Sequence, residues 1–262
     1  MALIDLSGRP TIIRRVTTSS GLRRRTPERG LVVGLGAAVL LMAAAHAVVP
    51  NQPWAPAWAE HDNEVRRFFE VAGEQNGWTW LNVVILATAA LLHAGVGWLS
   101  ALDGRRWWPW GLTALLLAGL SLDDLTALHE RLHDVGVALG GGSGPLRAAW
   151  VVPGAAVAVG VATGFLLLAR ELPRRPRTLL LAGLALLLGS ALGMEALSQS
   201  VLDSTGPSSA YGVLVLLEEV AEAAGAVLLA ASPVAAVAVR TAPGRLDVRL
   251  EKSPGESGSP AA

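Results

Sequence analysis

Residues that could bind a metal ion or transfer protons are concentrated between Gly119 and Asp134, a stretch that reads GLSLDDLTALHERLHD. Carboxylates and imidazoles are the side chains that bind divalent ions and act as general acids or bases. On a continuous helix Asp123, Glu130 and His133 would share one face, because positions three and four residues apart lie side by side. The stretch therefore predicts a polar site on one face of a helix.

Two kinds of metal site fit this pattern. The sequence HERLH is an H-E-x-x-H motif, which on a helix directs His129 and His133 at one zinc ion and makes Glu130 the catalytic base that activates a bound water. Alternatively, Glu130 and His133 combine with Glu219 and Glu222 in a carboxylate-rich two-metal site between bundle helices. The second site accounts for more of the acids, and either would bind a divalent ion such as iron, manganese or zinc. The candidate metal ligands are Asp123, His129, Glu130, His133, Glu195, Glu218, Glu219 and Glu222.

Long apolar runs must position these residues. The chain of 262 residues is 52% hydrophobic, and its mean hydropathy is +0.46. Each run is about as long as a helix that crosses a bilayer, roughly 20 residues, so we predict an all-α integral membrane bundle of about six transmembrane helices. Cysteine is absent, which excludes disulfides and thiolate metal ligands. The predicted spans are residues 31–49, 78–102, 110–129, 150–169, 178–198 and 211–239.

The first run has a second interpretation as a cleaved signal peptide, because Ala45-His46-Ala47 resembles a cleavage site. Its length, and that of the polar segment before it, favour a retained helix. The chain then divides into a disordered basic cytoplasmic tail at 1–30, a six-helix transmembrane domain at 31–239 and a disordered cytoplasmic tail at 240–262.

The basic residues indicate the orientation in the membrane. Of the 21 Lys and Arg residues, seven lie in the first tail, two and four in the turns at 103–106 and 170–177, four in the last tail, and only four in the remaining loops. The positive-inside rule then predicts that both termini are cytoplasmic and that the acids lie in the outer half of the bilayer. The Arg-rich, Ala/Gly/Leu-rich composition is typical of a GC-rich bacterial genome, so we expect a bacterial cytoplasmic (inner) membrane.

The carboxylates of three predicted helices reach a similar depth in this arrangement. An ionised carboxylate near the centre of a membrane helix costs roughly 2.5–3.5 kcal/mol, and these helices carry no Lys or Arg at that depth. Three explanations remain open. The acids bind a metal ion, they are protonated in a hydrogen-bonded polar core, or they form a proton or ion path.

Segments in three predicted spans resemble a family of uncharacterised bacterial multi-pass membrane proteins, whose members carry S-[LI]-D-[ED]-x(4)-H-E and L-E-E-x(2)-E-x(2)-G. In this chain they read SLDD…LHE, GMEAL and LEEVAEAAG. The resemblance implies a shared site but no particular reaction, and His133 lies outside its pattern. The matching positions are Ser121, Leu122, Asp123, Asp124, His129 and Glu130, then Leu217, Glu218, Glu219, Glu222 and Gly225.

From these residues we expect a metal-binding integral membrane protein, and catalysis on a lipid or another hydrophobic substrate is one role that its metal site could serve. Two other classes stay open. One is a proton- or cation-coupled transporter, and the other is a structural or partner-binding membrane subunit with a protonated polar core. The expected partners are the lipid bilayer and a hydrophobic small molecule, without nucleic acid.

Overall fold

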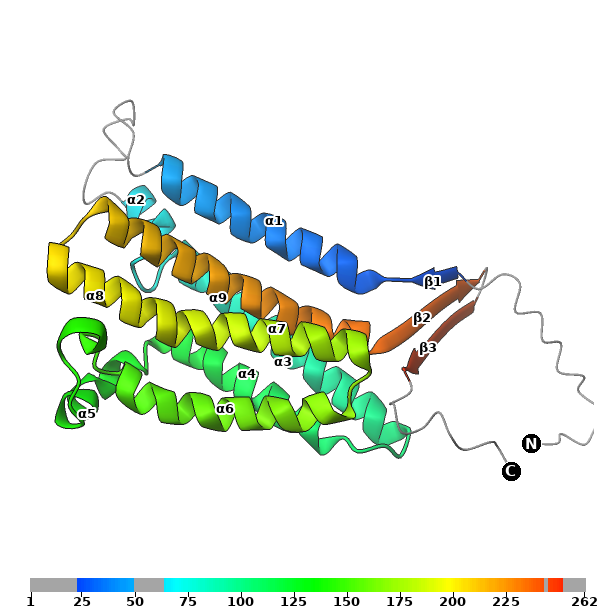
Figure 1. Cartoon of the computed structure of the whole chain (residues 1–262). Helices are drawn as coiled ribbons and strands as arrows, with labels where there is room; N and C mark the ends of the chain where they lie inside the picture. Colours follow the sequence, from blue (N-terminus) through cyan, green and yellow to red (C-terminus); the bar gives the residue numbers. More distant parts are fainter. Residues whose placement is uncertain (1–22, 50–63, 243–244, 252–262) are drawn as a thin grey trace, which may run out of the picture.

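Long helices lie roughly parallel in a bundle, with a small β-sheet at one end (Figure 1). The computed structural model describes residues 23–49, 64–242 and 245–251. Most of each predicted apolar run forms helix, which confirms the all-α class, although residues 127–129 form a turn and residues 237–239 belong to a strand. The long helices are α1 (Pro27–Val48), α3 (Gly77–Leu102), α4 (Trp108–Thr126), α6 (Val151–Glu171), α7 (Arg174–Leu188) and α9 (Ser209–Ala235).

Short elements connect these helices at the end away from the sheet. A π-helical turn, η4 (Gly189–Met194), links α7 to α8 (Glu195–Thr205), so the two form one long rod. π-helical turns are rare and are frequent at functional sites. The other short elements are α2 (Glu64–Phe69), η2 (Glu130–Leu132), α5 (His133–Ala138) and η3 (Gly144–Leu146).

Four helices are long and apolar enough to cross a membrane: α1, α3, α6 and the α7–α8 rod. A fifth candidate is the bent pair formed by α4 and residues 130–138, whose axes differ by 81°. Helix α9 has the length of a span but carries three glutamates near its middle. The structure thus supports four or five candidate spans, and the six predicted from sequence remain a prediction.

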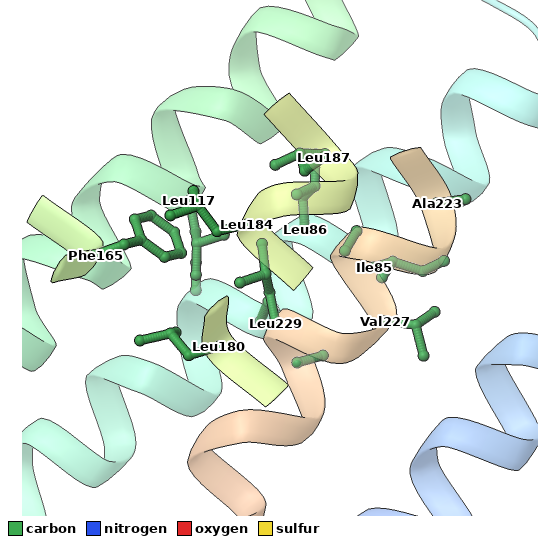
Figure 2. Packing of buried hydrophobic residues seen from close by; sticks show 14 of the residues in the cluster. Ile85, Leu86, Leu117, Phe165, Leu180, Leu184, Leu187, Ala223, Val227 and Leu229 are labelled. Carbon is green, nitrogen blue, oxygen red and sulfur yellow. The ribbon is translucent and has the colours of Figure 1, made fainter. Parts of the chain in front are cut away.

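Helix α9 is central to the bundle and packs against α1, α3 and α7. It crosses α7 at two glycines, because a Cβ on Gly183 would lie 2.8 Å from the carbonyl oxygen of Gly225. Around this crossing, fully buried side chains from α3, α6, α7 and α9 form the apolar core, including Ile85, Phe165 and Leu229 (Figure 2). The core fills the middle of the bundle and separates its two ends.

The sheet differs from the disordered tails predicted at 1–30 and 240–262. Strand β2 (Val237–Ala242) pairs antiparallel with β1 (Arg23–Arg25) and with β3 (Arg245–Leu250). Hydrogen bonds between the strands satisfy the backbone polar groups of these segments, a possibility that composition alone does not reveal. Both ends of the described chain therefore lie at one end of the bundle (Figure 1). Residues 27–30 of the predicted first tail form the start of α1, and residues 1–22, 243–244 and 252–262 lie outside the described residues.

Candidate metal centre

A cavity of about 760 Å³ opens at the end of the bundle away from the sheet. Helices α3, α4, α6 and α9 contribute to its wall, together with η4, α8 and the loops next to them. Seven of the eight metal ligands predicted from sequence line this one cavity. They are Asp123, His129, Glu130, Glu195, Glu218, Glu219 and Glu222.

The break after α4 sets the position of His129. Helix α4 ends at Thr126 because Ala127 adopts a left-handed conformation with φ 48°, which turns the chain away from the helix axis. The carboxylate of Asp123 stabilises the turn at two points. It accepts a hydrogen bond from the backbone N–H of His129 at 2.8 Å, and its other oxygen lies 3.0 Å from His129 Nδ1. One carboxylate therefore fixes both the backbone and the ring of His129.

Glu74, His129 and Glu130 form the only group of three metal-ligating side chains that the described residues bring together. One candidate ligand atom from each lies within 4.8 Å of the other two. Glu74 belongs to the loop before α3, and Glu130 opens the turn that follows His129. The ring of Trp150 packs against His129, with ring centroids 4.6 Å apart, and closes one side of the group.

The sequence pattern assumed one continuous helix from Asp123 to His133, and this assumption is wrong. Because the chain bends after Thr126, Asp123 and His133 do not share a helical face. His133 starts the separate helix α5, is exposed and does not line the cavity. The H-E-x-x-H geometry is therefore absent, since that motif needs both histidines on one helical face.

The remaining predicted ligands lie in the cavity but outside the group of three. Glu219 accepts a hydrogen bond of 2.7 Å from the indole N–H of Trp78. Glu218 is buried, and its carboxyl lies 3.2 Å from Ser198 Oγ. Gln199 donates to Glu195 at 3.4 Å. These contacts join α8, α9 and α3, so the acids contribute to the packing of three helices around the cavity.

Two buried polar atoms in the cavity wall have no hydrogen-bond partner among the described residues. They are Oδ1 of Asn82, which is 3% exposed, and Oδ2 of Asp124. Buried polar groups in folded proteins are nearly always paired with protein, water or an ion. Both atoms face the space in which water or an ion could bind.

The charge of the cavity is strongly unbalanced. Eight carboxylic acids line it, with Arg131 as the single arginine. Burial raises the pKa of Glu74, and the nearby carboxylates raise it further against the opposing effect of His129. Burial alone would lower the pKa of His129, but the hydrogen bond to Asp123 and the surrounding negative charges outweigh it, so this pKa is raised. The raised pKa of His129 is the direction expected where carboxylates surround the ring at the mouth of the cavity.

Sequence reasoning missed Glu74, gave the two cavity tryptophans no role in the site, and favoured a contact between helices for Asn82. Glu74 lies in a loop with no helical period, so no spacing rule links it to His129. Asn82 sits on an otherwise apolar helix, which was a usable signal because a polar residue in such a helix needs a partner. Trp78 and Trp150 lie at the ends of predicted spans, a position typical of interfacial aromatics, although Trp78 also donates a hydrogen bond inside the cavity.

A family model described as a domain of unknown function (DUF8692) matches residues 32–237, which include every candidate site residue. Neither the curated proteins nor the solved structures contain a match to the chain.

Proposed function

We propose that this chain, which belongs to the DUF8692 family, is an integral membrane protein that binds a divalent metal ion at the mouth of its acidic cavity and receives a hydrophobic substrate there. The ligands are Glu74, His129 and Glu130. Both termini face the cytoplasm in this proposal, and the cavity lies in the outer half of a bacterial inner membrane.

The unbalanced charge of the cavity is the observation that carries the proposal. Eight carboxylic acids and one arginine line the same space. Like charges repel strongly in a medium of low dielectric, so the acids need protons or a bound cation. The group at the mouth favours a cation, because imidazole and carboxylate together are typical metal ligands.

The hydrogen bond to Asp123 supports His129 as a ligand. A metal-binding histidine commonly donates its second ring N–H to a carboxylate, which fixes the ring and makes the ligating nitrogen more basic. Asp123 contacts Nδ1, which leaves Nε2 for the ion. A site of two carboxylates and one imidazole suits manganese or iron. Zinc more often occupies softer sites that are rich in sulfur and histidine.

Apolar side chains make up much of the rest of the cavity wall and support a hydrophobic substrate. Leu115 on α4 and Val157 on α6 both line the cavity, yet they are 68% and 56% exposed on the outer surface of the bundle. Nearer the sheet, Gly164 lets the two helices pack closely, since a Cβ there would overlap Leu116. The gap between α4 and α6 would open the cavity sideways to lipid.

The metal ion would supply Lewis acidity or an activated water in this proposal. As a ligand, Glu130 is less suited to the role of free catalytic base that its place in the H-E-x-x-H motif suggested. Glu219 and Asp124 also line the cavity and are better placed to accept or return a proton.

A transporter fits the described residues less well. The core around Ile85, Leu117 and Leu180 fills the middle of the bundle (Figure 2). A second hollow lies at the sheet end of the bundle, and no residue lines both this hollow and the acidic cavity. A continuous polar path between the two ends is therefore absent from the described part of the chain.

Thermal unfolding with and without metal tests the proposal. A chelator should lower the melting temperature of the purified protein at neutral pH, and added Mn²⁺ or Fe²⁺ should restore it, because the ion binds the folded state alone. Glu130→Gln should reduce this response, whereas Glu64→Gln on the exposed helix α2 should not. If chelation has no effect and Glu222→Gln stabilises the protein, the acids are a protonated structural core and the metal assignment is wrong.

A further inference from the structure

A second hollow, of about 500 Å³, lies at the sheet end of the bundle. Three segments that are distant in sequence meet there. They are the turn between α3 and α4, the turn between α6 and α7, and the end of β3. The elements that line this hollow meet at the sheet end of the bundle, whereas α8, which lines the acidic cavity, lies at the other end (Figure 1). The apolar core lies between the two ends (Figure 2).

Arginine dominates the charge of this hollow, which we call the basic pocket. Four arginines and two glutamates line it. Arg106 forms an ion pair of 2.7 Å with Glu171, and Arg105 donates to the backbone carbonyl of Glu251 at 3.2 Å. The arginines in the pocket are Arg105, Arg106, Arg170 and Arg177.

The other two arginines carry the excess positive charge. Arg177 donates from Nε to the carbonyl of Ala169 and from Nη2 to that of Leu172, both at 2.8 Å. These bonds cap the end of α6 and fix the guanidinium without neutralising it. Neither Arg170 nor Arg177 has a carboxylate within ion-pair distance among the residues that the structure describes. The pocket thus presents one fixed and one exposed guanidinium.

The surroundings of the pocket match the depth of lipid headgroups. Trp110 lines the pocket, and its neighbours Trp107 and Trp108 are 56% and 44% exposed. Exposed tryptophan next to arginine is typical of the boundary between the apolar bilayer and water. Basic pockets between helices at this boundary suit anionic lipid headgroups.

We propose that the basic pocket binds the phosphate of an anionic membrane phospholipid through Arg170 and Arg177. A guanidinium matches a phosphate with two parallel hydrogen bonds, and a fixed guanidinium loses little freedom on binding. The headgroup would bridge the turn after α3, the start of α7 and the end of β3, and so would attach the sheet to the bundle. This inference rests on the membrane location proposed above and is independent of the metal site.

Lipid binding to the full chain, measured by native mass spectrometry from detergent with chelator present, tests the proposal. Phosphatidylglycerol should be retained at least tenfold more strongly than phosphatidylcholine. Arg170→Gln, at an exposed position, should weaken retention about fivefold, since a basic residue near an anionic surface contributes about 1 kcal/mol. Arg131→Gln, at the other end of the bundle, is the matched control and should leave retention unchanged.

Three results would overturn the proposal. The first is equal retention of both lipids. The second is an equal loss of lipid retention in Arg170→Gln and Arg131→Gln. The third is displacement of the lipid by glycerol 3-phosphate at equal concentration, which would assign the pocket to a soluble phosphate. Arg177→Gln adds a second variant, whose melting temperature separates loss of the α6 cap from loss of the ligand. His129→Ala should not change lipid retention, so failure of the metal site and failure of this site are distinguishable. Failure of the protein to enter bilayers would contradict the membrane location itself.

Discussion

Asp123 accepts hydrogen bonds from both the backbone and the ring of His129, which makes it a positioning residue for the metal ligand. Asp123→Asn keeps the size of the side chain but removes its charge. We expect metal affinity to fall about 10- to 100-fold, as is common when the carboxylate behind a ligating histidine is lost. Competition with a fluorescent chelator would measure this change. Asp134→Asn, on the exposed surface of α5, is the control and should leave the affinity unchanged.

The raised pKa values of His129 and Glu74 predict how stability depends on pH in the metal-free protein. A raised pKa means that the folded state binds the proton more tightly than the unfolded chain. The stability from each group is complete below its ordinary value, 6.5 for His129 and 4.5 for Glu74, and is lost as the pH rises through its raised pKa.

Melting temperatures of the metal-free protein should therefore fall between about pH 6 and pH 8, the range in which histidine titrates. The stabilisation by added Mn²⁺ should grow over the same range, because the ion replaces the protons. His129→Gln should weaken both trends, and the acids of the cavity should retain the rest. A metal-free protein that becomes more stable between these pH values would contradict the assigned environment of His129.

For single residues, residue types and spacing predicted most of the acids of the cavity but not its geometry. Asp123, His129 and Glu130 were identified because charged groups are rare in apolar runs. The left-handed conformation of Ala127 has no signal in the sequence, since alanine favours helix, and it removes His133 from the site. Glu74 joins the group through the tertiary fold alone.

Among the elements, the crossing of α7 and α9 depends on two glycines. A Cβ at Gly225 would lie 2.7 Å from the backbone nitrogen of Leu187 and 2.8 Å from the carbonyl oxygen of Gly183, and backbone atoms cannot move aside cheaply. We expect Gly225→Ala to destabilise the bundle by about 1–3 kcal/mol, the usual range for overpacking. Gly160→Ala, where a Cβ meets nothing within 4 Å, is the control. Equilibrium unfolding in mixed micelles would measure both, and equal stability of the two variants would contradict this packing.

Apolar runs predicted the long helices well, because a run of this length must be helical wherever water is excluded. The ends were less predictable. Strand β3 and the end of β2 lie in a segment whose Pro, Gly and Arg content resembles a disordered tail, and only their pairing with each other and with β1 reveals a sheet. The π-helical turn η4 likewise has no sequence signature, although it widens the α7–α8 rod beside the cavity.

For the whole molecule, the pairing of β1 with β2 places both ends of the described chain on one side of the bundle. We expect that side to be cytoplasmic, because most Lys and Arg residues lie there. The chain has no cysteine, so a single introduced cysteine is the only thiol that a reagent can label, and its labelling shows which side of the membrane it faces. A cysteine at Ser143 should react with a membrane-impermeant thiol reagent in intact cells, whereas one at Arg249 should react only after lysis. The reverse pattern would overturn the orientation.

The central claim is that the acidic cavity binds a metal ion through Glu74, His129 and Glu130. The most direct measurement is a titration of the metal-free protein with Mn²⁺, in which bound metal is counted by elemental analysis for the wild type and for His129→Ala. We predict one equivalent in the wild type and a loss of most of it in the variant, while His133→Ala keeps the full amount. A wild type without stoichiometric metal, or equal binding by His129→Ala, would contradict the claim.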